Sequence, residues 1–188
     1  MERRSLTRDG FRFSLRPCHE DDGDAIFDAA DESRARVGKW MDWLTPAYTR
    51  DDSRAWAGAA ADDWGKGSRY EFVIMDSTDD VISGCCGLNR INEKDLVCNL
   101  GYWVRESKIR KGAASEAARL LETFGHGELG LRRIEIVIAT DNSASRKVAE
   151  KLGATYEGIQ RMRLRIGDVS HDARMYALLA KRGETGAL

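Results

Sequence analysis

Seven segments of the chain have the apolar content of β-strands, and several of them alternate apolar with polar residues. The segment 11–16 places Phe11, Phe13 and Leu15 at every second position, and the segment 133–139 places three isoleucines in the same way. Side chains at every second position share one face of a strand, so each segment can bury one face. The predicted strands are residues 11–16, 70–76, 81–91, 96–104, 133–139, 155–166 and 171–179.

Other segments have the spacing or the end signals of helices. Behind Gly112, apolar residues stand at offsets of 3, 4, 7 and 10 from Ala114, which places them on one helical face. An acidic first turn indicates a helix over residues 20–37, and Gly153 stands where a C-terminal glycine is expected. The predicted helices are residues 20–37, residues 51–64, the segment that opens at Gly112, and residues 142–152.

The predicted order along the chain is β-α-α-β-β-β-α-β-α-β-β. Strands joined by short turns predict antiparallel pairing, and the crossover helix that opens at Gly112 predicts a mixed α/β sheet. We therefore expect a single domain over residues 1–188, with its core at about residues 11–180 and a frayed end at residues 181–188. In a sheet of this kind the ligand site is expected near the end of the central strand.

The composition narrows the classes of function. A net charge of −1 over 188 residues gives no basic field for nucleic acid, and no apolar run approaches the roughly 20 residues of a membrane span. The basic N-terminus has no apolar core behind it, so we expect no secretion signal. The four cysteines form no C-x-x-C pair and share no ligand spacing with the histidines. We expect reduced thiols in a cytoplasmic protein, and no metal site.

A basic, glycine-containing loop joins the central predicted strand to the helix behind it. The first N–H groups of a helix lack intrahelical partners and carry the positive end of the helix dipole, so they can hold phosphate oxygens. Arg110 and Lys111 add positive charge, while Gly112, Ala113 and Ala114 are small enough for the backbone to approach a pyrophosphate. The alternative interpretation is an exposed basic loop before an ordinary helix.

A second candidate follows the strand at residues 133–139. Asn142 is well suited to cap the next helix, and Ser145 stands three residues further on, where N-terminal helix positions favour serine. This structural interpretation explains both residues. The functional alternative is that the Ser145 hydroxyl donates a proton in a cleft beside the phosphate site.

Two further groups are candidates for contact with an acceptor molecule. Trp40 and Trp43 lie in an aromatic loop, where they are either core residues or a platform for a substrate. Arg161, Arg163 and Arg165 alternate with apolar residues, so period-two geometry places them on one strand face. Such a row is either a solvated face or a binding row for an acidic or phosphorylated acceptor.

Four motifs, taken in order and spacing, resemble those of the GNAT acetyltransferases. The resemblance extends from about residue 13 to residue 179. More narrowly, the pattern resembles the RimJ/RimL branch, which acetylates the N-termini of ribosomal proteins. It implies a single GNAT-like domain with a twisted, mostly antiparallel sheet flanked by helices. The motifs are Gly101-Tyr102-Trp103-Val104, Arg110-Lys111-Gly112-Ala113-Ala114, Asn142-x-x-Ser145 and Lys151-Leu152-Gly153-Ala154-x-x-Glu157-Gly158.

The resemblance also implies the roles of individual residues, with acetyl-CoA as the donor and no metal. Its pantetheine arm would pair with the backbone of the central strand where that strand splays from its neighbour, and the N–H near Val104 would polarise the thioester carbonyl. Ser145 would protonate the leaving thiolate. The residues implied in holding acetyl-CoA are Tyr102, Trp103, Val104, Ile109, Arg110, Lys111, Gly112, Ala113, Ala114 and Asn142.

Three positions depart from the family pattern. Ile109 stands where the phosphate motif usually begins with Gln or Arg, and Asn99 and Leu164 stand where family members often carry Glu. Because the usual candidates for a general base are missing, we expect the site to favour weakly basic amines. An α-amino group has a pKa of about 7.7–8.0, so on the order of a tenth is neutral at pH 7, whereas a lysine side chain has a pKa of about 10.4.

The resulting hypothesis is transfer of an acetyl group from acetyl-CoA to a primary amine, first of all the N-terminal α-amine of a protein or peptide. One alternative is acetylation of a small molecule, such as an aminoacyl nucleotide, an amino acid or an antibiotic, in contact with Trp40, Trp43, Arg161 and Arg163. Another is a catalytically silent module that senses acetyl-CoA. A homodimer is compatible with the exposed edges that such a sheet would have.

Overall fold

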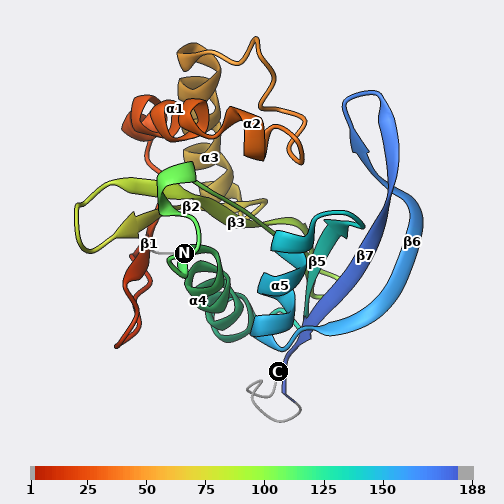
Figure 1. Ribbon diagram of the computed structural model, residues 1–188. Helices are drawn as coiled ribbons and strands as arrows, with labels where there is room; N and C mark the ends of the chain where they lie inside the picture. Colours follow the sequence, from red (N-terminus) through yellow and green to blue (C-terminus); the bar gives the residue numbers. More distant parts are fainter. Residues whose placement is uncertain (1–2, 182–188) are drawn as a thin grey trace.

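The computed structural model describes residues 3–181, and this part of the chain contains one sheet of seven strands. Its order is β1-β2-β3-β4-β5-β7-β6, in which β4 and β5 are parallel and the other neighbours are antiparallel. The expected mixed, mostly antiparallel sheet is confirmed (Figure 1). The predicted frayed end lies outside the described residues, except for Lys181. The strands are β1 (Phe13–Pro17), β2 (Tyr70–Asp76), β3 (Ile82–Asn92), β4 (Val97–Val104), β5 (Arg133–Ala139), β6 (Thr155–Ile166) and β7 (Val169–Leu179).

Helices lie on both sides of the sheet (Figure 1). One side carries α4 (Ala113–Gly127) and α5 (Ser143–Leu152). The opposite side carries α1 (Gly23–Glu32), α2 (Arg34–Val37) and α3 (Arg50–Lys66). Two short 3-10 turns complete the fold: η1 (Glu20–Asp22) precedes α1, and η2 (Glu106–Lys108) lies between β4 and α4.

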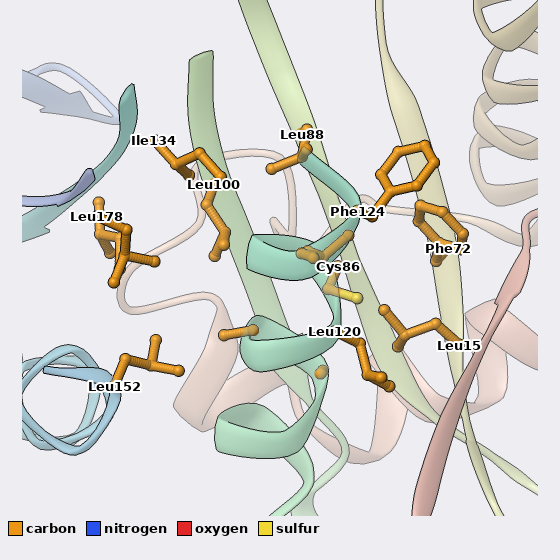
Figure 2. Close-up of a cluster of buried hydrophobic side chains, with 14 of the residues drawn as sticks. Leu15, Phe72, Cys86, Leu88, Leu100, Leu120, Phe124, Ile134, Leu152 and Leu178 are labelled. Carbon is orange, nitrogen blue, oxygen red and sulfur yellow. The ribbon is translucent and has the colours of Figure 1, made fainter. Parts of the chain in front are cut away.

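The larger part of the core lies between α4 and the sheet (Figure 2). The apolar positions that predicted this helix, among them Ala117, Leu121 and Phe124, are at most 2% exposed. The ring of Phe124 packs edge-on against that of Phe72 on β2, with ring centroids 5.5 Å apart. Because burial of one large apolar side chain contributes about 1.5–3 kcal/mol, this face fixes the direction in which α4 leaves its N-terminal loop.

The single helix predicted over residues 20–37 is wrong, because the structure divides this segment into η1, α1 and α2. The break is at Ser33, whose buried hydroxyl donates a 2.7 Å hydrogen bond to the Ala29 carbonyl. A serine that bonds to the backbone in this way competes with continuation of a helix. The same oxygen accepts the Glu106 N–H at 3.0 Å, so the corner between α1 and α2 is tied to η2.

A buried ion cluster attaches η2 to the end of β2. Lys108 is 6% exposed and its Nζ lies 2.9 Å from Asp76 Oδ2, with Asp79 as a second partner. Arg12 donates two hydrogen bonds to the Asp76 carboxylate, at 2.8 and 2.6 Å. The bonds from Arg12, together with those from Lys108 and Thr78, hold the pKa of the Asp76 carboxyl far below its usual range. The cluster therefore fixes the start of the loop that leads into α4.

We predict that Asp76→Asn lowers the free energy of unfolding by about 3 kcal/mol, because it removes the buried carboxylate that pairs with both Lys108 and Arg12 and leaves Lys108 with Asp79 alone. Urea denaturation followed by circular dichroism measures this loss. The Asp76 contribution is present above the unfolded pKa of about 3.9 and is lost as the pH falls through the lower folded pKa. The wild type should therefore have a higher free energy of unfolding than the variant above about pH 4, and this difference should disappear only at lower pH.

The matched control is Asp28→Asn, which removes the exposed ion pair between Asp28 and Arg50 at 2.7 Å. Exposed pairs contribute about 0–1 kcal/mol, so this variant should unfold close to the wild type. Equal stabilities of the two variants would contradict the role assigned to the cluster.

Candidate functional site

The central strand β4 has two unequal edges. On one side it pairs with β3 as far as Val104, opposite Gly84. On the other side it pairs with β5 only at Val97, Cys98 and Asn99. From residue 100 onward this edge has no strand partner among the described residues, so its N–H and C=O groups are available to an extended ligand. The expected splay is present.

The expected phosphate loop lies directly beyond this open edge. It runs from η2 to the N-terminus of α4, with Arg110 at φ +59° and Gly112 at φ +97°. The first i to i+4 bond of the helix goes from Glu116 N–H to the Gly112 carbonyl, so the N–H groups before it remain for a ligand. Arg110 and Lys111 are exposed and form no ion pair with a residue in the described range.

The remaining members of the loop differ in exposure. Ile109 and Ala114 are half-buried, and Ala113 is 2% exposed against the core. The small side chain at residue 113 therefore lets the first turn of α4 sit against the sheet. The charge of the loop comes from Arg110 and Lys111 rather than from the position of Ile109.

Asn142 and Ser145 both take part in the cap that the sequence predicts. The Asn142 side chain accepts the Ser145 N–H at 3.0 Å, at the start of α5. The Ser145 hydroxyl is not used in this cap. It lies 2.7 Å from the Tyr102 hydroxyl on β4, which also donates to the Ser145 carbonyl at 3.2 Å. The side chain of Ser145 therefore bonds to Tyr102 rather than to the cap, while its backbone closes the helix end.

Burial raises the pKa of the Tyr102 phenol to about 12, although its hydrogen bond with Ser145 acts in the opposite direction. Tyr102 therefore keeps its proton at neutral pH and can donate it. The contact between Tyr102 and Ser145 was missed by the sequence analysis, because the two residues are 43 positions apart. The only signal was that both belong to motifs placed near the same end of the sheet.

A cleft of about 520 Å³ opens beside the start of α5. Trp40 lines it together with Asn142, so a residue predicted to contact the acceptor and one predicted to contact the cofactor share one cavity. Lys39 Nζ lies 4.7 Å from the centre of the Trp40 ring. The other residues along the cleft are Glu32, Ala35, Arg36, Glu106, Asp141, Ser143 and Ala144.

Trp43 packs against Trp103 of the central strand. Its ring centroid is 5.9 Å from that of Trp103 and 5.1 Å from that of Tyr48. The half-buried Trp103 projects to the side of the sheet where α1 and α3 pack. Trp43 therefore combines the two interpretations given above: it packs in a cluster, and that cluster borders the open edge of β4.

The arginine row on β6 does not have the regular geometry that the sequence suggests. The register between β6 and β7 shifts between Gln160 and Leu164, and Met162 has φ +51°. The Met162 N–H bonds instead to the Asp172 carboxylate at 2.9 Å. The bulge therefore interrupts the regular two-residue period from which the shared face of the three arginines was predicted.

Individually, the arginines differ in their surroundings. Arg161 is exposed, Arg163 is half-buried, and Arg165 pairs with Asp168 in the hairpin turn. Among the described residues that line the cleft near Trp40, no arginine of β6 occurs. The structure thus does not bring Arg161 and Arg163 together with Trp40.

The two positions that lack the usual Glu have other roles in the structure. Asn99 donates a 3.0 Å hydrogen bond to Asn89 on β3, and Leu164 pairs with His171 on β7. Within residues 3–181, no group of three or more His, Cys, Asp or Glu side chains is placed to hold a metal ion. No helix in the same range is long and apolar enough to cross a membrane.

A sequence model of the acetyltransferase (GNAT) domain matches residues 12–155. The chain belongs to the GNAT family. This GNAT protein is similar to YdaF of Bacillus subtilis (strain 168), which is described as a candidate ribosomal N-acetyltransferase. The two are 25% identical over 177 residues, which cover 91% of this chain and 93% of YdaF.

Solved structures share the same fold. One is RimL, described as a ribosomal L7/L12 α-N-protein acetyltransferase in complex with coenzyme A, with a TM-score of 0.85 and 22% identity over 93% of this chain and 97% of that one. Another is MccE, the microcin C7 self-immunity acetyltransferase in complex with acetyl-CoA and AMP, with a TM-score of 0.83 and 21% identity over 93% and 98%. By its family this GNAT protein is an acetyl-CoA-dependent acetyltransferase, and its fold is that of RimL and MccE.

We predict that Gly112→Ala weakens the binding of CoA about tenfold. A side chain at φ +97° strains the backbone by about 1–3 kcal/mol, so the loop must shift away from the arrangement that faces the phosphates. Isothermal titration calorimetry with CoA measures the change.

Gly58→Ala is the matched control. Gly58 lies in α3, and a Cβ there would have no neighbour within 4 Å. This variant should bind CoA like the wild type. If Gly112→Ala also binds CoA like the wild type, the loop does not hold the pyrophosphate.

Proposed function

We propose that this GNAT protein transfers the acetyl group of acetyl-CoA to the N-terminal α-amine of a protein. The observation that carries the proposal is the open edge of β4 beside the hydrogen-bonded pair of Tyr102 and Ser145. An extended thioester carrier along this edge would end beside a serine hydroxyl whose partner is a protonated phenol. The likeness to RimL, a protein α-N-acetyltransferase by its description, supports the choice of acceptor.

In this proposal, the loop of Ile109, Arg110, Lys111, Gly112, Ala113 and Ala114 holds the pyrophosphate, and the backbone of Tyr102, Trp103 and Val104 aligns the pantetheine arm. The Val104 N–H polarises the thioester carbonyl, where negative charge develops during attack. Ser145 gives its proton to the departing sulfur, and the Tyr102 hydroxyl at 2.7 Å is placed to restore it. Asn142 contacts the arm at the start of α5.

The preference for an α-amine follows from the chemistry of attack, since only the neutral amine is a nucleophile. About a tenth of α-amino groups are neutral at pH 7, against well under a thousandth of lysine side chains. Asn99 and Leu164 place no carboxylate at the two positions where the family resemblance leads one to expect Glu. Without a carboxylate at either of these positions, the site selects acceptors that lose their proton easily.

A second candidate function is acetylation of a small molecule with a base to stack and a phosphate to bind. The cation–aromatic pair of Lys39 and Trp40 at the cleft favours it, as does the likeness to MccE in complex with AMP. Arg161 and Arg163 would not take part in this contact, because they do not line the cleft beside Trp40. A silent acetyl-CoA sensor is the outcome if no amine is acetylated.

We further propose that the whole chain forms one catalytic domain and that it acts in the cytoplasm as a homodimer. The outer edge of β6, with Tyr156, Ile159 and Met162 between 47% and 74% exposed, supports an association of two copies. Four unpaired, buried cysteines and relatives described as modifying ribosomal proteins support the location.

A panel of amines tests the function. Release of CoA thiol is measured with acetyl-CoA and three probes: pentapeptides with a free α-amine and no lysine, the same peptides blocked at the N-terminus but carrying a lysine, and aminoacyl nucleotides. We expect the free α-amine peptides to be the best acceptors. Preference for the lysine peptides would contradict the proposal, preference for the nucleotides would support the second function, and no release at all would indicate a sensor.

Ser145→Ala tests the proton donor. We predict a fall in kcat of about 100-fold, the lower range for loss of a general acid, with CoA affinity unchanged. The affinity should hold because alanine keeps the N–H that bonds to Asn142 at 3.0 Å. Stopped-flow kinetics and calorimetry measure the two quantities. Equal losses of turnover and CoA affinity would instead indicate that Ser145 serves only the helix start.

A further inference from the structure

A carboxyl group that no predicted role uses is buried in the sheet beside the open edge of β4. Glu71, the second residue of β2, is 8% exposed as a residue, and its side chain is 10% exposed. Neither of its carboxylate oxygens forms a hydrogen bond with a residue in the described range. Its nearest cation is Arg69, whose Nε lies 4.0 Å away and itself has no hydrogen-bond partner there. Burial of a carboxyl group without hydrogen bonds costs folding free energy, so its position calls for an explanation.

The position of the carboxyl group is defined by two glycines. Glu71 pairs with Gly87 on β3, and Gly87 pairs with Gly101 on β4. A Cβ at Gly87 would lie 2.3 Å from Glu71 Oε2, so the side chain lies across β3 and requires glycine there. At Gly101 a Cβ would have only Asn89 Nδ2 within 4 Å, at 3.7 Å. Since neighbouring strands are about 4.8 Å apart, the carboxylate reaches to about one strand spacing from Gly101.

Gly87 and Gly101 carry no side chain, so they define a strip across the sheet, called the trough below, in which the Glu71 side chain lies over Gly87. Directly paired residues project to the same face, and so do residues two apart on one strand. Asn89 and Asn99, joined by a 3.0 Å hydrogen bond, therefore border the trough on one side. Cys85 and Trp103 border it on the other. One end is closed by Glu71, and the other opens at Gly101, within the part of β4 that has no β5 partner.

This face of the sheet is the one from which an amine would attack. Tyr102 projects to the opposite face, toward Ser145 on α5, where the proposed proton donor for the sulfur lies. At the reacting carbon the incoming nitrogen and the departing sulfur occupy different positions. If the sulfur gains its proton from the α5 side, the nitrogen would lose its proton on the side of Gly101, Trp103 and Trp43.

We propose that Glu71 accepts the proton that the amine loses during acetyl transfer, through water in the glycine-floored trough that leads from Gly101. The inference rests on the proposed function. A C–N bond forms as the C–S bond breaks; one proton moves from the amine nitrogen to the Glu71 carboxylate, and another moves from the Ser145 hydroxyl to the sulfur. Glu71 then returns its proton to solvent, and Ser145 regains one from solvent through the Tyr102 hydroxyl, so that amine and acetyl-CoA give amide and CoA thiol with both residues restored.

The environment of Glu71 suits this task. Burial raises the pKa of its carboxyl to about 7, Arg69 acts to lower that pKa, and Asp63 on α3 acts to raise it. The other titratable groups around it are the thiols of Cys18, Cys85 and Cys86, whose own pKa values are raised by burial, so they are neutral. A base of pKa about 7 matches an α-amine of about 7.7–8.0 far better than a lysine of about 10.4.

The test is the pH dependence of kcat/KM with a pentapeptide that has a free α-amine and no lysine. In the wild type, two groups must lose a proton, the peptide amine and Glu71, so log kcat/KM should rise with a slope of two below about pH 6. Glu71→Gln keeps the size of the side chain and removes the ionisation. We expect a slope of one and, at pH 7.5, a fall in kcat/KM of about 100-fold, with CoA affinity unchanged by calorimetry.

Asp63→Asn provides a second variant that keeps Glu71 in place. Removing the charge that raises the Glu71 pKa, and freeing Arg69 from its 2.9 Å ion pair, should move the acid limb to lower pH without lowering the plateau. A slope of two in Glu71→Gln, or a uniform loss at every pH, would overturn the inference, since a purely structural role predicts that pattern. A wild type that acetylates no amine would instead overturn the proposed function.

Discussion

The site depends on the small number of ladder pairs between β4 and β5. Three parallel pairs hold the two strands together at their N-terminal ends, after which β4 continues with β3 alone. If the parallel ladder extended to Val104, the backbone groups that we assign to the pantetheine arm would already be used. The fold keeps these groups available without leaving β4 loose, because the full-length antiparallel ladder with β3 fixes its other edge.

The sheet also separates the chemistry into two sides. Tyr102 and Trp103 are neighbours in the chain and therefore project to opposite faces. Tyr102 meets α5 and the Ser145 hydroxyl, whereas Trp103 meets Trp43 from the segment behind α2. The two faces of β4 therefore carry the proposed proton donor on one side and the proposed proton acceptor on the other. The loop before α4 is held independently, by the ion cluster of Lys108 and by the contact of η2 with Ser33.

Much of this arrangement can be predicted from the sequence, and the parts that cannot have identifiable causes. Strands and helices with a clear period, such as β5 and α4, are found where alternation and helical spacing place them. Ser33 and Met162 were not anticipated, because a serine bonded to the carbonyl four residues earlier and a bulge opposite Asp172 are set by contacts that no local period records.

The candidate site also has parts that could be predicted from the sequence and parts that could not. The phosphate loop and the cap at Asn142 are local motifs, so the sequence predicts both their residues and their backbone geometry. The pair of Tyr102 and Ser145 joins distant segments, and Glu71 becomes notable only when β2, β3 and β4 are placed in register. The one local signal for Glu71 was a charge between the two aromatic residues Tyr70 and Phe72, which does not by itself distinguish a solvated face from a buried group.

The burial of the cysteines has a consequence for the product of the reaction. Each acetyl transfer releases a free CoA thiol, which can form a mixed disulfide with any accessible cysteine under oxidising conditions. Cys18, Cys85, Cys86 and Cys98 are all 2% exposed or less, and burial raises the pKa of Cys18 and Cys98 to about 12. Buried thiols that are not ionised react slowly, so the cysteines of this protein should not form mixed disulfides with the CoA that it releases.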